Sequence, residues 1–107
     1  MRYELLLAPG AVQELRALSA HIRSQVRDAL KRHLRHEPTR VSKSRIKRLR
    51  GLTRPQYRLR VGEIRVFHDV TADAVEILAI ITKERAEEWL ASEGIATEDG
   101  GSGEGEG

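Results

Sequence analysis

The residues best suited to chemistry are three arginines and one aromatic residue, which lie within a short stretch of alternating character. Residues 57–68 read Tyr-Arg-Leu-Arg-Val-Gly-Glu-Ile-Arg-Val-Phe-His. The Gly-Glu pair in the middle predicts a two-residue hairpin turn, because glycine first is what a type II′ turn prefers. Pairing across this turn puts the three arginines and one aromatic residue on the same sheet face, and the aliphatic residues of the hairpin on the opposite face. The first face carries Arg58, Arg60, Arg65 and Phe67. Clustered guanidinium groups suit a phosphate, since each presents a fork of N–H donors to two oxygens.

Two interpretations of this basic face are open. In the predicted register Arg60 opposes Arg65, and like charges opposed on adjacent strands destabilise a sheet. A surface that needed only solubility could avoid that cost, so the pattern favours phosphate binding, with Phe67 available to stack on a base. The alternative is an ordinary charged surface, in which Glu76 or the acids of the C-terminal tail neutralise the arginines.

The charge distribution points to a polyanionic partner. The chain has 107 residues, which fits one domain, with 19 basic and 16 acidic residues. All the basic residues precede residue 86, whereas five of the acids fall in residues 93–107, so the body carries +8 and the tail −5. Residues 40–65 hold ten basic residues and one acid. Nucleic acid is the commonest polyanion that such a cluster attracts.

Several classes of site are excluded or disfavoured. The absence of cysteine excludes disulfides, zinc–thiolate sites and thiol catalysis. His21, His33 and His36 lack carboxylates at ligand spacing, so we expect no metal. There is no Gly-rich phosphate loop, no Ser-His-Asp set and no pair of carboxylates with catalytic spacing. No apolar run approaches the roughly 18 residues that span a bilayer, and residues 5–8 are too short for a signal peptide. We expect a cytoplasmic protein without a membrane partner.

The elements that must position the basic face follow from periodicity. We expect a strand over residues 3–7, helices over 11–18 and from Ser19 to before Pro38, and a loop over 39–46. Strands of period two follow from residue 47, and the last of them, residues 75–81, is apolar on both faces and therefore interior. A final helix over 83–92 is docked by Trp89, while His68 lies half-buried on the core face. The Gly-rich acidic residues 93–107 are expected to be disordered.

Four motifs in this order are specific to one superfamily. They are Leu-Arg-Gly within residues 47–52, Tyr-Arg-Leu-Arg-Val-Gly at 57–62, Ile-Arg-Val at 64–66 and Ile-Ile-Thr-Lys-Glu-Arg at 80–85. Through them the sequence resembles the RelE/ParE superfamily of bacterial toxin–antitoxin toxins over residues 2–91. The resemblance implies a RelE-like α+β fold over residues 1–92. Such a fold has an N-terminal strand, an αα-hairpin, an antiparallel sheet of three to four further strands and a short C-terminal helix.

The RelE branch of this superfamily implies a ribosome-dependent endoribonuclease that inhibits translation. In these toxins the RNA 2′-hydroxyl attacks the adjacent phosphate without a metal or other cofactor, and basic residues stabilise the transition state. The resemblance implies that Arg50, Arg58, Arg60, Arg65 and Lys83 match the family's basic positions. We expect Arg58, Arg60, Arg65 and Lys83 to be catalytic, and Arg50, Phe67 and Trp89 to bind RNA. The implied partners are a cognate antitoxin protein, the ribosome and mRNA.

One departure from the RelE pattern leaves the branch open. RelE-like nucleases commonly carry Tyr or His on the last helix for proton transfer, and here the matching residue is Trp89, whose indole is neither acid nor base near neutral pH. Lys83 or Glu84 could serve instead. The ParE branch shares the scaffold but inhibits DNA gyrase without a nuclease site, which is the alternative. A toxin that has lost activity is a third possibility.

Overall fold

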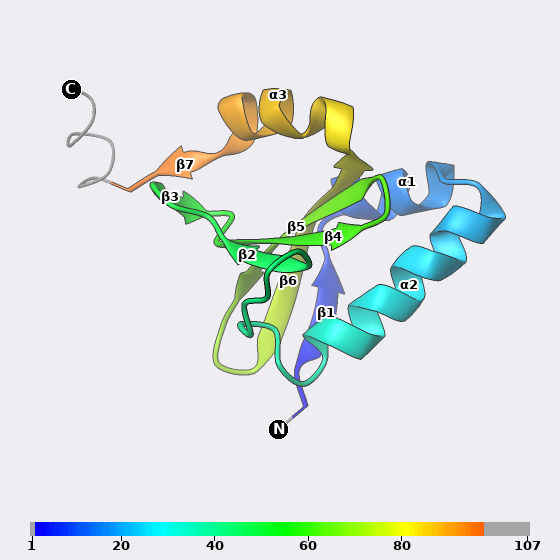
Figure 1. Cartoon of the computed structure of the whole chain (residues 1–107), viewed down its shortest axis with the longest axis horizontal. Coiled ribbons are helices and arrows are strands. Elements are labelled where there is room, and N and C mark those ends of the chain that lie inside the picture. Colours follow the sequence, from blue (N-terminus) through cyan, green and yellow to red (C-terminus); the bar gives the residue numbers. More distant parts are fainter. Residues whose placement is uncertain (1, 98–107) are drawn as a thin grey trace.

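A mixed sheet of five strands with helices on both faces forms the body of the molecule, and a second sheet of two strands lies beside it (Figure 1). The computed structural model describes residues 2–97. The elements are β1 (Glu4–Leu7), α1 (Pro9–Ala17), α2 (Ala20–Leu34), β2 (Ile46–Arg48), β3 (Leu52–Arg54), β4 (Tyr57–Val61), β5 (Ile64–Val70), β6 (Ala74–Thr82), α3 (Lys83–Glu93) and β7 (Ile95–Ala96). The architecture is α+β, as the sequence predicts.

The helical hairpin forms where the sequence changes from strand to helical periodicity. Pro9 occupies the first turn of α1, where its missing N–H would have no partner in any case. Ser19 caps α2, since its hydroxyl accepts a hydrogen bond from the Ile22 amide at 3.4 Å. The apolar stripe of α2 is buried against the sheet through Val26, Leu30 and Leu34. The two helices therefore cover one sheet face.

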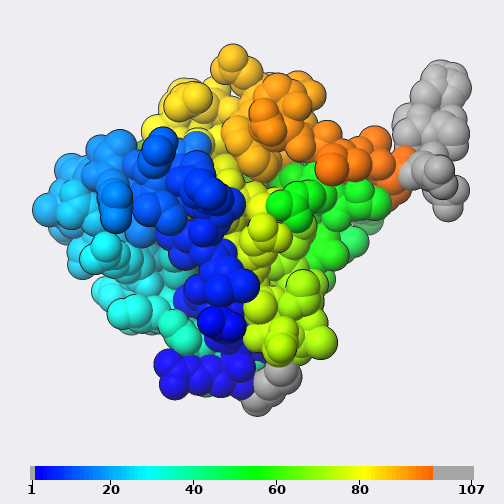
Figure 2. All heavy atoms as spheres, turned by 180° about the vertical axis from the view of Figure 1, so that it is seen from behind, coloured from blue at the N-terminus to red at the C-terminus, as the bar shows by residue number. Residues whose placement is uncertain are grey.

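The sheet has the order β1-β6-β5-β4-β2. The pairs among β6, β5, β4 and β2 are antiparallel, as predicted, whereas β1 joins β6 in parallel. Seen from behind, the dark-blue β1 runs beside the yellow-green β6 (Figure 2). As predicted, β6 is an interior strand.

The predicted register of the central hairpin is confirmed residue by residue. Arg60 opposes Arg65, Arg58 opposes Phe67, and Leu59 opposes Val66. Gly62 begins the turn with φ of +58°, a conformation that glycine adopts without steric cost. The two faces of this hairpin therefore carry the side chains that the alternation assigns to them.

Two apolar clusters lie on opposite faces of the sheet. The larger one packs the helical hairpin on the face that carries Leu59 and Val66. The smaller one packs α3 on the other face, around Phe67, Ala79 and Ile81. The arginines of the hairpin therefore share their face with α3.

The C-terminal boundary differs from the sequence prediction. α3 ends at Glu93, and Ile95–Ala96 form β7, which pairs with β3. The Thr53 hydroxyl donates to the Ile95 carbonyl at 3.1 Å, and the Thr97 amide donates to the Gly51 carbonyl at 3.1 Å. Residues 93–97 are therefore part of the fold, although the sequence predicts disorder from residue 93. The rest of the predicted tail, residues 98–107, lies outside the described residues.

Candidate nucleic-acid interface

Three arginines of β4 and β5 project from the sheet face that α3 partly covers; together we call them the arginine face: Arg58, Arg60 and Arg65. The register of β2 adds Lys47, which pairs directly with Arg58 and therefore points to the same side. Lys47 and Arg60 are exposed, whereas Arg58 and Arg65 are half-buried. Sequence reasoning missed Lys47 as a member of this group, because its register depends on a strand of only three residues.

The arginine face lacks acidic partners in the part of the chain that the structure describes. None of the ion pairs within 4.0 Å among residues 2–97 involves Arg58, Arg60 or Arg65. Neutralisation by Glu76, the alternative considered from sequence, is therefore wrong. The acids of the tail beyond residue 97 lie outside the described residues.

Glu76 is instead bound to a different arginine at the other end of the same sheet face. Arg54 Nη1 donates to Asp69 Oδ2 and to Glu76 Oε1, each at 3.2 Å, and Nη2 donates to Glu76 Oε2 at 3.3 Å. Asp69 also accepts the Gln56 amide at 2.7 Å. The face is thus divided into a neutralised end around Arg54 and an unneutralised basic end.

The charges of the arginine face act on one another. Burial lowers the pKa of Arg58, and the positive charges of Arg65 and Arg60 lower it further. The Arg58 Nε is buried without a hydrogen-bond acceptor among the described residues, and Nη2 reaches the Ser44 carbonyl only at 3.4 Å. An anion beside these guanidinium groups would relieve the repulsion, so the cluster suits a phosphate group.

The hairpin turn brings the cation of Lys83 close to the arginine face. Arg65 Nη1 donates to the Gly62 carbonyl at 2.9 Å, and the Lys83 Nζ pairs with Glu63 Oε1 at 3.1 Å. The Lys83 amide also donates to the Glu63 carbonyl at 2.9 Å. The start of α3 is therefore fixed to the turn that positions Arg65. Both partners of the ion pair are largely exposed, so Lys83 can exchange Glu63 for another anion at little cost.

The prediction for Phe67 as a base-stacking residue is wrong. Its side chain is 1% exposed, and its ring stacks on Trp89 with centroids 5.1 Å apart and planes 9° from parallel. Strand alternation places Phe67 on the polar face, but it cannot show that α3 folds over that position. Trp89 docks α3 on the sheet, as the sequence predicts, and one face of its ring is occupied.

The remaining predicted residues are dispersed. Arg50 is exposed in the turn between β2 and β3, and no hydrogen bond or ion pair joins it to the arginine face within residues 2–97. Glu84 is exposed in the first turn of α3. Thr82 precedes this helix without a side-chain capping bond. α3 carries neither tyrosine nor histidine.

His68 lies on the core face as predicted, but it is fully buried rather than half-buried. Its ring stacks on Tyr57 at 5.5 Å, and burial lowers its pKa to about 4. Backbone groups of Pro38 and Val66 near the ring oppose this shift, although neither ring nitrogen makes a hydrogen bond of full geometry within the described residues. His68 is therefore a neutral core residue that belongs to no site.

Two other kinds of feature, a metal site and a membrane-spanning helix, are absent from residues 2–97. No group of three or more His, Asp or Glu residues in that range has the arrangement that could hold a metal ion. No helix of the same range has the length and apolar character needed to cross a membrane.

Comparison with known proteins identifies the fold through structure alone. No protein-family model and no curated protein matches the sequence. The chain is similar to a double-arginine mutant of the Escherichia coli toxin RelE in the free state, with a TM-score of 0.63 and 24% identity over 83% of this chain and 92% of that one. It is also similar to the toxin–antitoxin complex RelBE2 from Mycobacterium tuberculosis, with a TM-score of 0.61 and 23% identity over 78% of this chain and 100% of that one. It is also similar to the RelB–RelE antitoxin–toxin complex from Methanococcus jannaschii, with a TM-score of 0.62 and 21% identity over 78% of this chain and 96% of that one. The chain has the RelE fold.

Proposed function

We propose that this chain is the toxin of a type II toxin–antitoxin system and inhibits translation as a ribosome-dependent mRNA endoribonuclease. The observation that carries the proposal is the arginine face, which no described carboxylate neutralises. A fold that merely displayed surface charge would pair these arginines as it pairs Arg54. The RelE fold, shared with proteins named as toxins and toxin–antitoxin complexes, supports the same conclusion.

The proposed reaction needs charge stabilisation more than any other contribution. The 2′-oxygen of a ribose loses its proton and attacks the adjacent phosphorus, and the bond from phosphorus to the 5′-oxygen breaks. The products are a 2′,3′-cyclic phosphate and a 5′-hydroxyl, which receives a proton. The phosphorane-like transition state carries one more negative charge than the substrate, so Arg58, Arg60 and Arg65 would stabilise it more than the ground state.

Proton transfer would fall to the first turn of α3. Trp89 cannot supply it, because the indole does not titrate near neutral pH and its ring is stacked on Phe67. Lys83 lies beside the turn that holds Arg65, and Glu84 follows it on exposed helix surface. Arginine at the strand positions contributes charge alone, since its guanidinium stays protonated. A modest turnover rate is therefore part of this proposal.

A second candidate is a DNA gyrase inhibitor of the ParE type, which would need no proton-transfer residue. The composition of α3, without tyrosine or histidine, is the observation that favours it. In that case the arginine face would bind an acidic protein surface. Both candidates act in the cytoplasm and are controlled by a cognate antitoxin, whose acidic segment would lie on the arginine face.

Controlled expression separates the two candidates. Under the nuclease proposal, induction stops incorporation of labelled amino acids within minutes, while thymidine incorporation continues. Under the gyrase alternative, DNA synthesis stops first and cells form filaments. Normal growth at a verified level of folded protein would contradict both candidates.

A further inference from the structure

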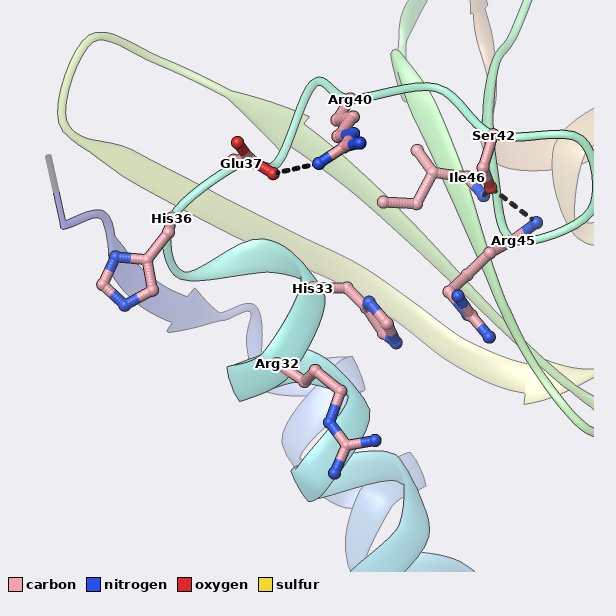
Figure 3. Close-up of a pocket in the computed structure, with 8 residues that line it drawn as sticks. All are labelled: Arg32, His33, His36, Glu37, Arg40, Ser42, Arg45 and Ile46. Carbon is pink, nitrogen blue, oxygen red and sulfur yellow. Dashed lines mark hydrogen bonds and ion pairs between the residues drawn. The ribbon is translucent and has the colours of Figure 1, made fainter.

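A basic hollow of about 290 Å³ lies behind the arginine face, between the end of α2 and the loop that leads to β2 (Figure 3). Three arginines, one carboxylate and an imidazole contribute to its wall, which Ile46 makes partly apolar: Arg32, Arg40, Arg45, Glu37 and His33. In Figure 3 the side chains of Arg32, His33 and Arg45 lie around the same space. Nothing in the proposed cleavage chemistry uses these residues.

The charge of this hollow is unbalanced. Its acidic residue, Glu37, is bound to Arg40 at 2.9 Å. No ion pair within 4.0 Å involves Arg32 or Arg45 in the described range, although Asp28 lies one turn before Arg32 on the same helix. Two guanidinium groups therefore face the hollow with their donors available.

The pKa of His33 reflects the excess positive charge around the hollow. Burial lowers its pKa, and the charges of Arg45 and Arg32 lower it further. Both arginines are therefore close enough to His33 to act on its ring. An anion between them would reverse this effect, because it stabilises the protonated imidazole.

The loop that carries Arg45 is held in place by its own hydrogen bonds. The Ser42 hydroxyl accepts from the Arg45 amide at 3.0 Å and from the Ile46 amide at 3.1 Å. The Ser42 amide in turn donates to the Ile46 carbonyl at 3.0 Å. This turn fixes the backbone of Arg45, so an anion bound there meets a partly preorganised site.

The hollow and the arginine face share one wall. The Arg60 amide donates to the Arg45 carbonyl at 2.8 Å, and Arg58 Nη2 approaches the Ser44 carbonyl at 3.4 Å. β2 is the edge strand of the sheet on this side. A chain of phosphates could therefore pass from the arginine face around the β2 edge into the hollow.

We propose that Arg32, Arg45 and His33 form a second phosphate-binding site, which holds a backbone phosphate of the RNA whose scissile phosphate lies on the arginine face. This inference rests on the proposed function and deepens it, since it assigns the path of the substrate strand. The site contributes affinity and register and takes no part in bond cleavage.

The test is binding of a fluorescent ten-nucleotide RNA to the full chain over a range of salt concentrations. The double variant Arg32→Gln/Arg45→Gln should bind roughly tenfold more weakly at low salt, and the slope of log K against log salt should fall by about 0.7, the value for one phosphate of a single strand. The matched control Arg16→Gln/Arg27→Gln removes the same charge from exposed positions on α1 and α2. It should retain the slope of the unaltered chain.

A second measurement follows the ring protons of His33 by NMR, assigned with His33→Gln. Addition of the RNA should raise the pKa of His33 in the unaltered chain and in the control, and should not do so in Arg32→Gln/Arg45→Gln. Equal slopes for the two double variants, no response of His33, or no RNA binding at all would overturn the inference. Pocket-dependent RNA binding in a chain that fails to stop translation would instead overturn the proposed function and leave the phosphate site standing.

Discussion

Replacing Trp89 by alanine tests how α3 is attached to the sheet. No residue of this helix is fully buried, and its contacts with the sheet run through Ala86, Trp89 and Leu90. Trp89 has the largest of these side chains, and its ring stacks on the buried ring of Phe67 with centroids 5.1 Å apart. Truncating a buried aromatic residue costs about 3–5 kcal/mol, and a half-buried one belongs at the lower end. We expect a loss of about 3 kcal/mol, of which stacking accounts for roughly 1 kcal/mol.

The assay combines thermal unfolding with amide hydrogen exchange. A loss of this size lowers the melting temperature by roughly 12 °C or more in a domain of this length. Exchange should accelerate throughout α3 more than in β5, because the helix opens before the sheet. Trp89→Phe keeps a ring against Phe67 and should lose only about 1 kcal/mol. A Trp89→Ala protein that melts within about 2 °C of the unaltered chain but is inactive would refute this reasoning, and would assign the ring to RNA binding.

Three further predictions address the core, the last strand and the proton-transfer chemistry. Between pH 6.5 and about 4, His68 is protonated in the unfolded chain but not in the folded chain, so the free energy of unfolding should fall by about 3 kcal/mol as the pH decreases. Denaturant titrations of His68→Phe should show a flatter dependence of stability on pH, and an unchanged dependence would contradict the lowered pKa of His68. Deletion of residues 95–107 removes β7 and its bonds to β3, so the shortened chain should melt several degrees below a chain that lacks only residues 98–107. Equal melting temperatures would mean that β7 contributes nothing to the stability of the fold. Trp89→Tyr should increase the rate of mRNA cleavage on ribosomes if the lack of a phenol limits turnover. An unchanged rate in Trp89→Tyr, together with a large loss of cleavage in Glu84→Gln, would assign proton transfer to Glu84 at the start of α3.

The hairpin and its basic face could be predicted because their determinants are local. A two-residue turn and strict alternation fix the register of β4 and β5 without reference to the rest of the chain. The helices likewise follow from periodicity, a capping serine and two prolines. The parallel pairing of β1 with β6 is different, since the pattern of a four-residue strand does not encode the direction of a distant neighbour.

The errors in the candidate site come from contacts between distant segments. Alternation assigns Phe67 correctly to the face of the arginines, but only the folded chain brings Trp89 over it. The partner of Glu76 could not be identified, because Arg54 reaches it from a separate short strand. Strand β7 was missed for a similar reason, as it lies in a Gly-rich acidic segment and is defined by its pairing with β3.

The central claim is that the unneutralised arginine face acts on an RNA phosphate, and Arg60 is the residue that tests it most directly. Its side chain is exposed and makes no hydrogen bond or ion pair within residues 2–97, so Arg60→Gln should leave the fold intact. The measurement is cleavage of ribosome-bound mRNA by the purified chain, read by primer extension, with Arg27→Gln as a control of equal charge. We predict cleavage by the unaltered chain and the control, with a loss on the order of a hundredfold in Arg60→Gln. Equal cleavage by Arg60→Gln and Arg27→Gln, or no cleavage by the unaltered chain, would contradict the claim.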